Sequence, residues 1–210
     1  MYPQIISSLI CQTCPDWELY LIHNGPIETR GLVDHVAAAK DERIRMILNH
    51  EETGNYGHPL RLWALQDLRE GLLSRESTHV VITNADNYYM PAFVEAMLGA
   101  FDRDPNAVAA YCSQMVHNYM STHPTVHGPL PPGQPSTALT WESYRWGVTE
   151  CRLERGYIDC GGVMLRKDAA CSIDWPNFEH SSDWTYFANL IEKYGAERWK
   201  RVPGCLFVHN

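Results

Sequence analysis

Apolar and polar positions in the first 117 residues repeat with two different periods. A period of about 3.6 predicts helices over residues 3–13, 28–40, 60–74 and 91–104, while alternating or β-branched runs predict strands over 17–24, 43–50, 79–83 and 107–117. Strands and helices of this length follow one another in turn, as they do in βαβ units. The pattern therefore predicts an α/β fold with a largely parallel sheet and helical crossovers.

The regular alternation ends after residue 117. Residues 120–140 contain five of the thirteen prolines and have no periodicity, which indicates a long loop. Such a loop is either a lid or acceptor-binding segment, or a surface excursion without a specific role. Residues 143–167 then contain a strand-like segment, a Gly-Gly pair and an apolar run, and a helix over 181–195 and a strand over 204–210 are predicted to complete the chain.

Length and composition indicate one globular domain. The chain has 210 residues, of which 45% are hydrophobic, and this is enough to form a core. The formal charge is 17 − 25 = −8, which disfavours nucleic acid as the main partner. No apolar run approaches the roughly 20 residues of a membrane span, and no signal-peptide pattern opens the chain, so a soluble, cytoplasmic protein is expected.

The seven cysteines are scattered, and only Cys11 and Cys14 form a C-x-x-C pair. A zinc site needs a second pair of ligands at comparable spacing, and the sequence offers none. A thioredoxin-like pair opens a helix, whereas this pair lies at the end of the predicted first helix. Free thiols in a reducing compartment are therefore the favoured interpretation.

The segment His79–Pro91, HVVITNADNYYMP, combines a β-branched run with a polar ending. Open α/β sheets bind ligands at the carboxyl ends of their strands, where Asn84, Asp86 and Asn87 would lie. A strand-to-helix turn with a capping Asn or Asp before Pro91 explains the same residues. The local pattern leaves both interpretations open.

Five strings along most of the chain together resemble glycosyltransferase family 2, the inverting enzymes of the GT-A fold. In order, they are SLICQTCPDWELYLIHNGP, GNYGHPLRLWAL, ITNADNYYMPAFVEAML, YIDCGGVMLRKDA and EHSSDWTYFANLIEKYG. The third is especially similar to the bacterial spore-coat glycosyltransferases. The resemblance implies a single GT-A domain over 1–210, with a nucleotide-sugar-binding part over 1–118 and an acceptor and catalytic-base part over 119–210. The domain is either a whole protein or one part of a longer transferase.

The resemblance assigns metal binding to the turn after residue 83. Asp86 matches the acid that binds Mn²⁺ or Mg²⁺, and this ion bridges the diphosphate of the nucleotide-sugar. Ala85 stands where a companion acid is usual, and Asn84 where another acid sometimes lies, so the metal site would be weaker than most. His209, at the end of the last predicted strand, is either a second ligand or a surface histidine.

The resemblance also implies a catalytic base near the start of the helix predicted over 181–195. Asp183 is the expected base that removes the proton of the acceptor hydroxyl, and Glu179 is the alternative. Asp183 would also suit the first turn of a helix for electrostatic reasons alone.

Further positions match residues that contact the donor. Arg61 matches a residue that reaches toward the nucleotide, and Asn24 stands where an acid usually contacts the base, with His23 beside it as a substitute. Gly161 and Gly162 would allow close approach of the donor sugar. Tyr2 would be a remnant of the base-binding loop.

One departure from the family concerns the beginning of the fold. Family members start with a central strand, whereas this chain opens at Met1-Tyr2-Pro3, directly before the first predicted helix. A sheet without that strand would leave unpaired backbone groups. The expectation is that a segment of about ten residues is absent from this sequence, or that another strand fills the position.

The expected function is transfer of a sugar, with inversion, from a nucleotide-diphospho-sugar, UDP being the expected nucleotide, to a hydroxyl of a glycan or another acceptor. Ala85 leaves open a degenerate module that binds nucleotide or glycan without turnover. A sugar-phosphate nucleotidyltransferase has a related fold, but the glycine- and basic-rich signature that such enzymes carry near the start is not seen.

Overall fold

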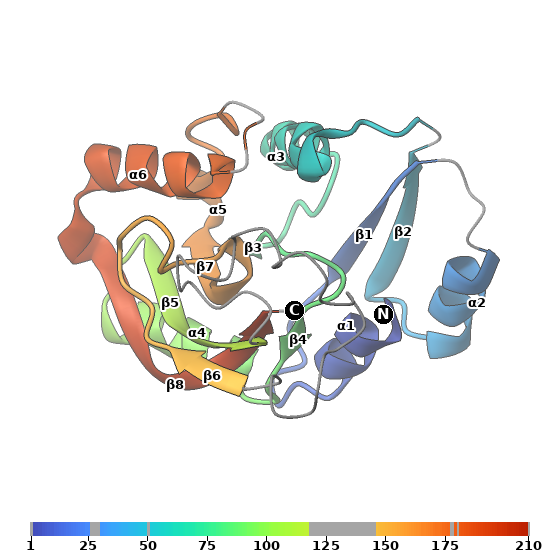
Figure 1. Cartoon of the computed structure of the whole chain (residues 1–210), viewed down its shortest axis with the longest axis horizontal. Coiled ribbons are helices and arrows are strands. Elements are labelled where there is room, and N and C mark those ends of the chain that lie inside the picture. The colour runs from blue at the N-terminus through green and yellow to red at the C-terminus, as the bar shows by residue number, and fades with distance from the viewer. Residues whose placement is uncertain are drawn as a thin grey trace, which may run out of the picture.

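A computed structural model describes residues 2–25, 30–49, 51–117, 146–176, 179 and 181–209. The proline-rich segment 120–140 lies outside the described residues, so its predicted lid role stays a prediction. All helices and strands predicted from periodicity are present, and Figure 1 shows their arrangement. None of the described helices is long and apolar enough to cross a membrane.

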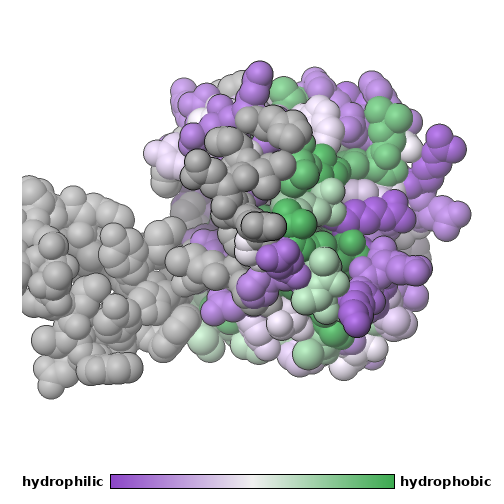
Figure 2. Space-filling model, turned by 90° about the vertical axis from the view of Figure 1, so that its right-hand side faces the viewer, coloured by the Kyte–Doolittle hydropathy of each residue, from purple (hydrophilic) through white to green (hydrophobic). Residues whose placement is uncertain are grey.

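The N-terminal quarter forms a small parallel sheet flanked by helices. Its elements are α1 (Tyr2–Ile10), β1 (Leu19–Asn24), α2 (Arg30–Ala39) and β2 (Ile44–Asn49). β1 pairs with β2 in register from Leu19 opposite Ile44 to Asn24 opposite Asn49. Figure 2 shows hydrophobic side chains near the middle of the face that carries β2 and α2, where Val33 and Leu48 are exposed.

The remaining strands form a separate six-stranded sheet with the order β3-β7-β5-β8-β4, to which β6 adds by pairing with β5. They are β3 (His79–Val81), β4 (Tyr88–Tyr89), β5 (Ala109–His117), β6 (Trp146–Thr149), β7 (Val163–Arg166) and β8 (Trp199–His209). In this sheet β5 and β8 pair in parallel, and the other described pairings are antiparallel.

The α/β class is therefore confirmed, but the sheet is more mixed than the alternation of elements predicted. The reason lies in β7, which runs between β3 and β5 and opposite to both. Both partners precede β7 in the chain, and the four-residue helix α5 (Lys167–Ala170), which follows β7, connects it to neither.

Helices cover both faces of the six-stranded sheet and create two apolar cores (Figure 1). α1 and α4 (Phe93–Arg103) pack on one face, while α3 (His58–Glu70), α5 and α6 (Ser182–Tyr194) pack on the other. Successive residues of β7 alternate between these cores: Met164 belongs to the first, and Val163 and Leu165 belong to the second. Because an apolar core covers each face of β7, every residue of Val163–Leu165 is apolar, and the sequence shows no alternation of polar and apolar residues.

β1 and β3 each have one edge without a neighbouring strand in the described structure: β1 on the side opposite β2, and β3 on the side opposite β7. In the described part of the chain β1 pairs only with β2, and β3 only with β7. No described strand lies between them, so the expectation that another strand fills this position is wrong for the residues that the structure describes.

Candidate active site

The turn after β3 holds Asp86 beside the end of β8. The backbone N–H of Asn87 donates to the carbonyl of Asn84 at 3.3 Å, and its fully buried side chain donates to Thr83 Oγ1 at 3.0 Å. β4 then pairs antiparallel with β8, with Tyr88 opposite Val208. This register brings the turn next to the last residues of β8.

Asp86 is half-buried, and its Oδ1 atom is fully enclosed without a hydrogen-bond partner among the described residues. Leaving a buried carboxylate oxygen without a donor costs about 1–3 kcal/mol or more. A cation or a ligand hydroxyl would satisfy this oxygen. Ala85 packs against the core formed by α1 and α4, so the usual position of the companion acid is occupied by a methyl group that faces apolar side chains.

His209 ends β8, is almost fully buried, and faces an acid that the sequence analysis missed. Its Nδ1 atom lies 3.5 Å from Oδ2 of Asp159. The other oxygen of Asp159 accepts the backbone N–H of Gly161 at 2.8 Å. The only sequence signal for Asp159 is an acid just before Cys160-Gly161-Gly162, and a turn cap explains that pattern equally well.

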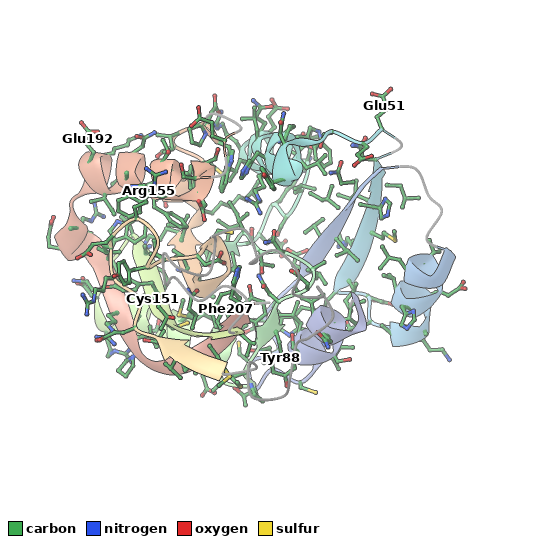
Figure 3. The ribbon with its side chains drawn as sticks, viewed as in Figure 1. Glu51, Tyr88, Cys151, Arg155, Glu192 and Phe207 are labelled. Carbon is green, nitrogen blue, oxygen red and sulfur yellow. The ribbon has the colours of Figure 1, made fainter. Side chains whose placement is uncertain are left out.

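Gly161 and Gly162 belong to a short 3₁₀ helix (Cys160–Gly162) below this turn. A Cβ atom on Gly161 would lie 2.6 Å from the ring of Phe207 and 3.0 Å from Asn87 Nδ2. The ring of Phe207 lies in the middle of the molecule (Figure 3). Tyr89 also donates its hydroxyl hydrogen to the carbonyl of Gly161 at 3.0 Å. The structure thus gives Gly161 a packing role next to the expected sugar site.

Asp183 lies in the first turn of α6 and is half-buried. Burial raises the pKa of its carboxyl group; the backbone N–H of Trp184, 2.7 Å from Oδ1, lowers it, the negative charge of Asp159 raises it, and the charge of Arg61 lowers it. Glu179 is exposed, and its backbone carbonyl, not its carboxylate, accepts hydrogen bonds from Ser182 at 3.0 and 2.7 Å. These environments favour Asp183 over Glu179 as the reactive carboxylate.

Arg61 connects α3 to the turn after β3. One guanidinium nitrogen donates to Asn84 Oδ1 at 2.7 Å, and the guanidinium carbon lies 5.2 Å from the ring centre of Trp175. Asn24, at the end of β1, accepts the backbone N–H and the hydroxyl of Thr53 at 2.9 and 3.0 Å. The amide NH₂ of Asn24 is therefore the group available for a ligand.

A cavity of about 1000 Å³ brings Asn24, Arg61, Asn84 and Ala85 together. Tyr56 joins them, and sequence reasoning did not single it out. It lies in the segment Gly54–Gly57, where four successive residues have φ angles of 60°, 47°, 55° and 74°. Side chains rarely adopt this conformation, and such strain is common at functional sites. Tyr56 is 73% exposed and lines the cavity, so it is accessible to a ligand there.

The remaining expected site residues lie elsewhere. Asp86, Asp183, Gly161, Gly162 and His209 do not line this cavity. Tyr2 is the first residue of α1, and its side chain lies outside the described part of the structure. Within the described ranges, no group of three or more His, Cys, Asp or Glu is arranged to hold a metal ion. The predicted metal site therefore stays a prediction that depends on oxygen atoms from the donor.

A solved structure supports the fold. The crystal structure of S. aureus TarS matches all of this chain with a TM-score of 0.62 and 14% sequence identity. The match covers 34% of TarS, so this chain spans about a third of that protein's length. No curated protein sequence matches significantly.

A family model connects the site to a known class of proteins. The model described as "Glycosyl transferase family 2" matches residues 2–161, which contain β1, the turn with Asp86, and the segment up to Gly161. Together with the TarS match, this confirms the GT-A fold expected from the sequence. The chain belongs to glycosyltransferase family 2.

Proposed function

We propose that this protein transfers a sugar from a nucleotide-diphospho-sugar to a hydroxyl group of an acceptor, with inversion of the anomeric centre. The observation that carries the proposal is the half-buried Asp183 carboxylate, within electrostatic range of Arg61, which lines the large cavity. Asp183 does not itself line the cavity, but the charge of Arg61 acts on its carboxyl group, and a perturbed carboxylate and a pocket with convergent polar groups are both typical features of catalytic sites.

The cavity suits the nucleotide part of the donor. The NH₂ group of Asn24 would donate to a carbonyl oxygen of a pyrimidine such as uracil, and Tyr56 would stack on the base. Arg61 offers the guanidinium fork that recognises phosphate oxygens, while its contact with Asn84 keeps it over the turn. A UDP-sugar is the donor that these groups favour.

The chemistry of Asp86 and His209 fits Mn²⁺ or Mg²⁺ shared with the donor. The unpartnered Oδ1 of Asp86 is the observation that favours a cation. One carboxylate and one imidazole are too few ligands for a closed protein site, so diphosphate oxygens would complete the coordination. When bound, the ion would neutralise the negative charge on the leaving diphosphate.

Asp159 would orient His209. Metal-binding histidines usually donate their second ring N–H to a carboxylate, which fixes the ring and its tautomer. The Nδ1 atom of His209 faces Asp159, so Nε2 would face the ion. Because Gly161 holds the other oxygen of Asp159, the carboxylate is already oriented for this role.

Asp183 would act as the general base. Its carboxylate would accept the proton of the acceptor hydroxyl as that oxygen attacks the anomeric carbon on the face opposite the diphosphate. The new carbon–oxygen bond forms while the bond to the diphosphate oxygen breaks, and the electron pair leaves with the diphosphate. The leaving group is a stabilised anion that needs no proton, so one carboxylate suffices.

The experiment has two stages. A panel of nucleotide-sugars is first screened by thermal shift, because a ligand that binds the folded state raises the melting temperature. Nucleotide release from the best donor is then measured with and without Mn²⁺ for the native protein, Asp86→Ala and Asp183→Asn. Glu179→Gln is the matched control, since its carboxylate is exposed. Mn²⁺-dependent release that only the two site variants lose supports the enzyme; release that survives in Asp183→Asn refutes the role of Asp183.

A second function is favoured by Ala85. Because its methyl group packs against the core, it offers no second carboxylate for a metal. The chain would then bind a nucleotide-sugar without turnover. A thermal shift with a donor, without any nucleotide release over hours, would support this binding module.

A further inference from the structure

His58 is a buried histidine at the start of α3 that takes no part in the proposed chemistry. Its side chain is only 2% exposed, and it follows Gly57, whose φ angle of 74° is left-handed. Residues three positions apart lie on the same face of a helix, so His58 and Arg61 point to the same side of α3. The imidazole ring therefore lies beside the guanidinium group that the proposed function assigns to the donor diphosphate.

One ring nitrogen of His58 contacts two other side chains. Its Nδ1 atom lies 3.1 Å from a guanidinium nitrogen of Arg61 and 3.2 Å from the indole nitrogen of Trp175. Guanidinium and indole nitrogens donate hydrogen bonds and cannot accept them. The Nδ1 lone pair must therefore accept both bonds, which places the ring hydrogen on Nε2 and makes the ring neutral.

Arg61 is held on both sides of its guanidinium group. One terminal nitrogen donates to His58, and the other donates to Asn84 Oδ1 at 2.7 Å. Asn84 belongs to the turn that also carries Asp86, so these two bonds direct the guanidinium group toward the expected diphosphate site. A side chain that is already fixed in its binding orientation loses less freedom when it binds an anion.

The His58 ring also connects Arg61 to the helix of the proposed base. His58 stacks on Trp175 with ring centres 5.8 Å apart, and Trp175 stacks on Tyr186 with ring centres 4.8 Å apart. Tyr186 is fully buried on α6, three residues after Asp183. Both α3 and α6 cover the same face of the six-stranded sheet (Figure 1). The three packed rings therefore fix Arg61 relative to the helix that carries Asp183.

Only a neutral acceptor suits the position of Nδ1. An apolar side chain of similar size would fill the space, but it would leave the indole N–H of Trp175 without this acceptor and would release one side of Arg61. Burying a donor without an acceptor destabilises the folded state. A protonated imidazole would direct an N–H toward two other donors, one of which is positively charged.

We propose that His58 is a positioning residue for Arg61. Its Nδ1 lone pair holds the guanidinium group in the orientation that binds the donor diphosphate, and its stacked ring keeps that orientation in register with α6. This inference rests on the proposed function, which assigns Arg61 to the diphosphate. Because His58 is buried, it acts on the donor only through Arg61.

Two substitutions separate the acceptor from the bulk of the ring. His58→Leu removes the acceptor, whereas His58→Asn retains one, since the amide oxygen replaces Nδ1. In crystal structures without nucleotide, Arg61 should leave Asn84 in His58→Leu and keep this contact in His58→Asn. An unmoved guanidinium group in His58→Leu would overturn the proposal. Nitrogen-15 NMR of the native protein needs no variant, and a hydrogen on Nδ1 of His58 would also overturn it.

Binding measurements test the connection to the diphosphate. Calorimetry compares UDP with uridine, because only UDP carries the charged oxygens that Arg61 would bind. His58→Leu should weaken UDP binding about tenfold and uridine binding less than about twofold, and His58→Asn should bind UDP within about threefold of the native protein. When Arg61→Ala is already present, His58→Leu should not weaken UDP binding further, because the two residues act as one unit.

The outcomes distinguish this inference from the proposed function. If the native protein binds UDP more tightly than uridine but His58→Leu weakens both equally, or if the losses of His58→Leu and Arg61→Ala add, the role of His58 is overturned and the donor site stands. If the native protein binds UDP no more tightly than uridine, the assignment of Arg61 to the diphosphate fails. The role of His58 in donor binding then fails with it, whatever the crystal structures of the variants show.

Discussion

Gly161→Ala tests the packing beneath the expected sugar site. The new Cβ atom would lie 2.6 and 2.7 Å from two atoms of the Phe207 ring, about 1 Å inside a normal carbon–carbon contact. The ring cannot retreat, because Phe207 is fully buried and packs against Tyr89 with ring centres 5.5 Å apart. Overpacking of this kind typically costs about 1–3 kcal/mol.

Gly162→Ala is the matched control, because the nearest atom to its added Cβ lies at 3.4 Å. For a chain of this length each kcal/mol lowers the melting temperature by about 2–4 °C, so Gly161→Ala should melt about 2–12 °C below the native protein. Gly162→Ala should stay within about 2 °C of the native protein. Thermal unfolding followed by circular dichroism measures both. Equal melting temperatures for the two variants would refute the contact with Phe207.

Three further predictions concern the site. Asp183→Asn should abolish turnover, and the activity of the native protein should fall on the acid side at a pH above the usual pKa of an aspartate. A carboxyl group whose pKa is raised in the folded state destabilises that state as the pH rises. The melting temperature of Asp183→Asn should therefore exceed that of the native protein by more at pH 7 than at pH 4. Tyr56→Ala should weaken nucleotide binding about 5- to 100-fold by calorimetry with stability changed by less than about 0.5 kcal/mol, since the ring is exposed. Asp159→Asn should weaken Mn²⁺ binding about 10- to 100-fold, measured by paramagnetic resonance, because the contact with His209 is lost. The same variant should shift the acid side of the pH–activity profile to lower pH, because the charge of Asp159 raises the pKa of Asp183. An unchanged pH–activity profile would contradict this coupling.

The regular elements of the fold could be predicted because burial imposes a period on the sequence. α4 buries residues at helical spacing and β5 is a long, largely buried run, and the predicted bounds of both are close to those observed. β4 has two residues, which is too short to show any period, although it fixes the turn of Asp86 against β8. The antiparallel direction of β7 is likewise invisible in the sequence, because a strand buried on both faces reads as an apolar run in either direction.

The candidate site residues could be predicted only where a charged side chain at the end of a predicted element indicates a chemical role. Asp86, Asp183 and Arg61 are charged residues at the ends of predicted elements, and in the structure the charge of Arg61 lowers the pKa of Asp183. Asp159 and Tyr56 were missed because a turn cap and an exposed aromatic residue are common in any protein. Their roles depend on contacts between segments that are distant in sequence, such as Asp159 with His209.

Asp159 connects the two halves of the proposed chemistry. Its charge raises the pKa of Asp183, and its Oδ2 atom faces Nδ1 of His209. A single carboxylate at Asp86 would be a poor metal site, and a histidine that Asp159 keeps in one orientation would compensate by reducing the freedom lost on binding. A negative charge near Asp183 also makes it a stronger base. In the proposed mechanism, one acid held by the backbone of Gly161 would therefore support both donor binding and proton removal.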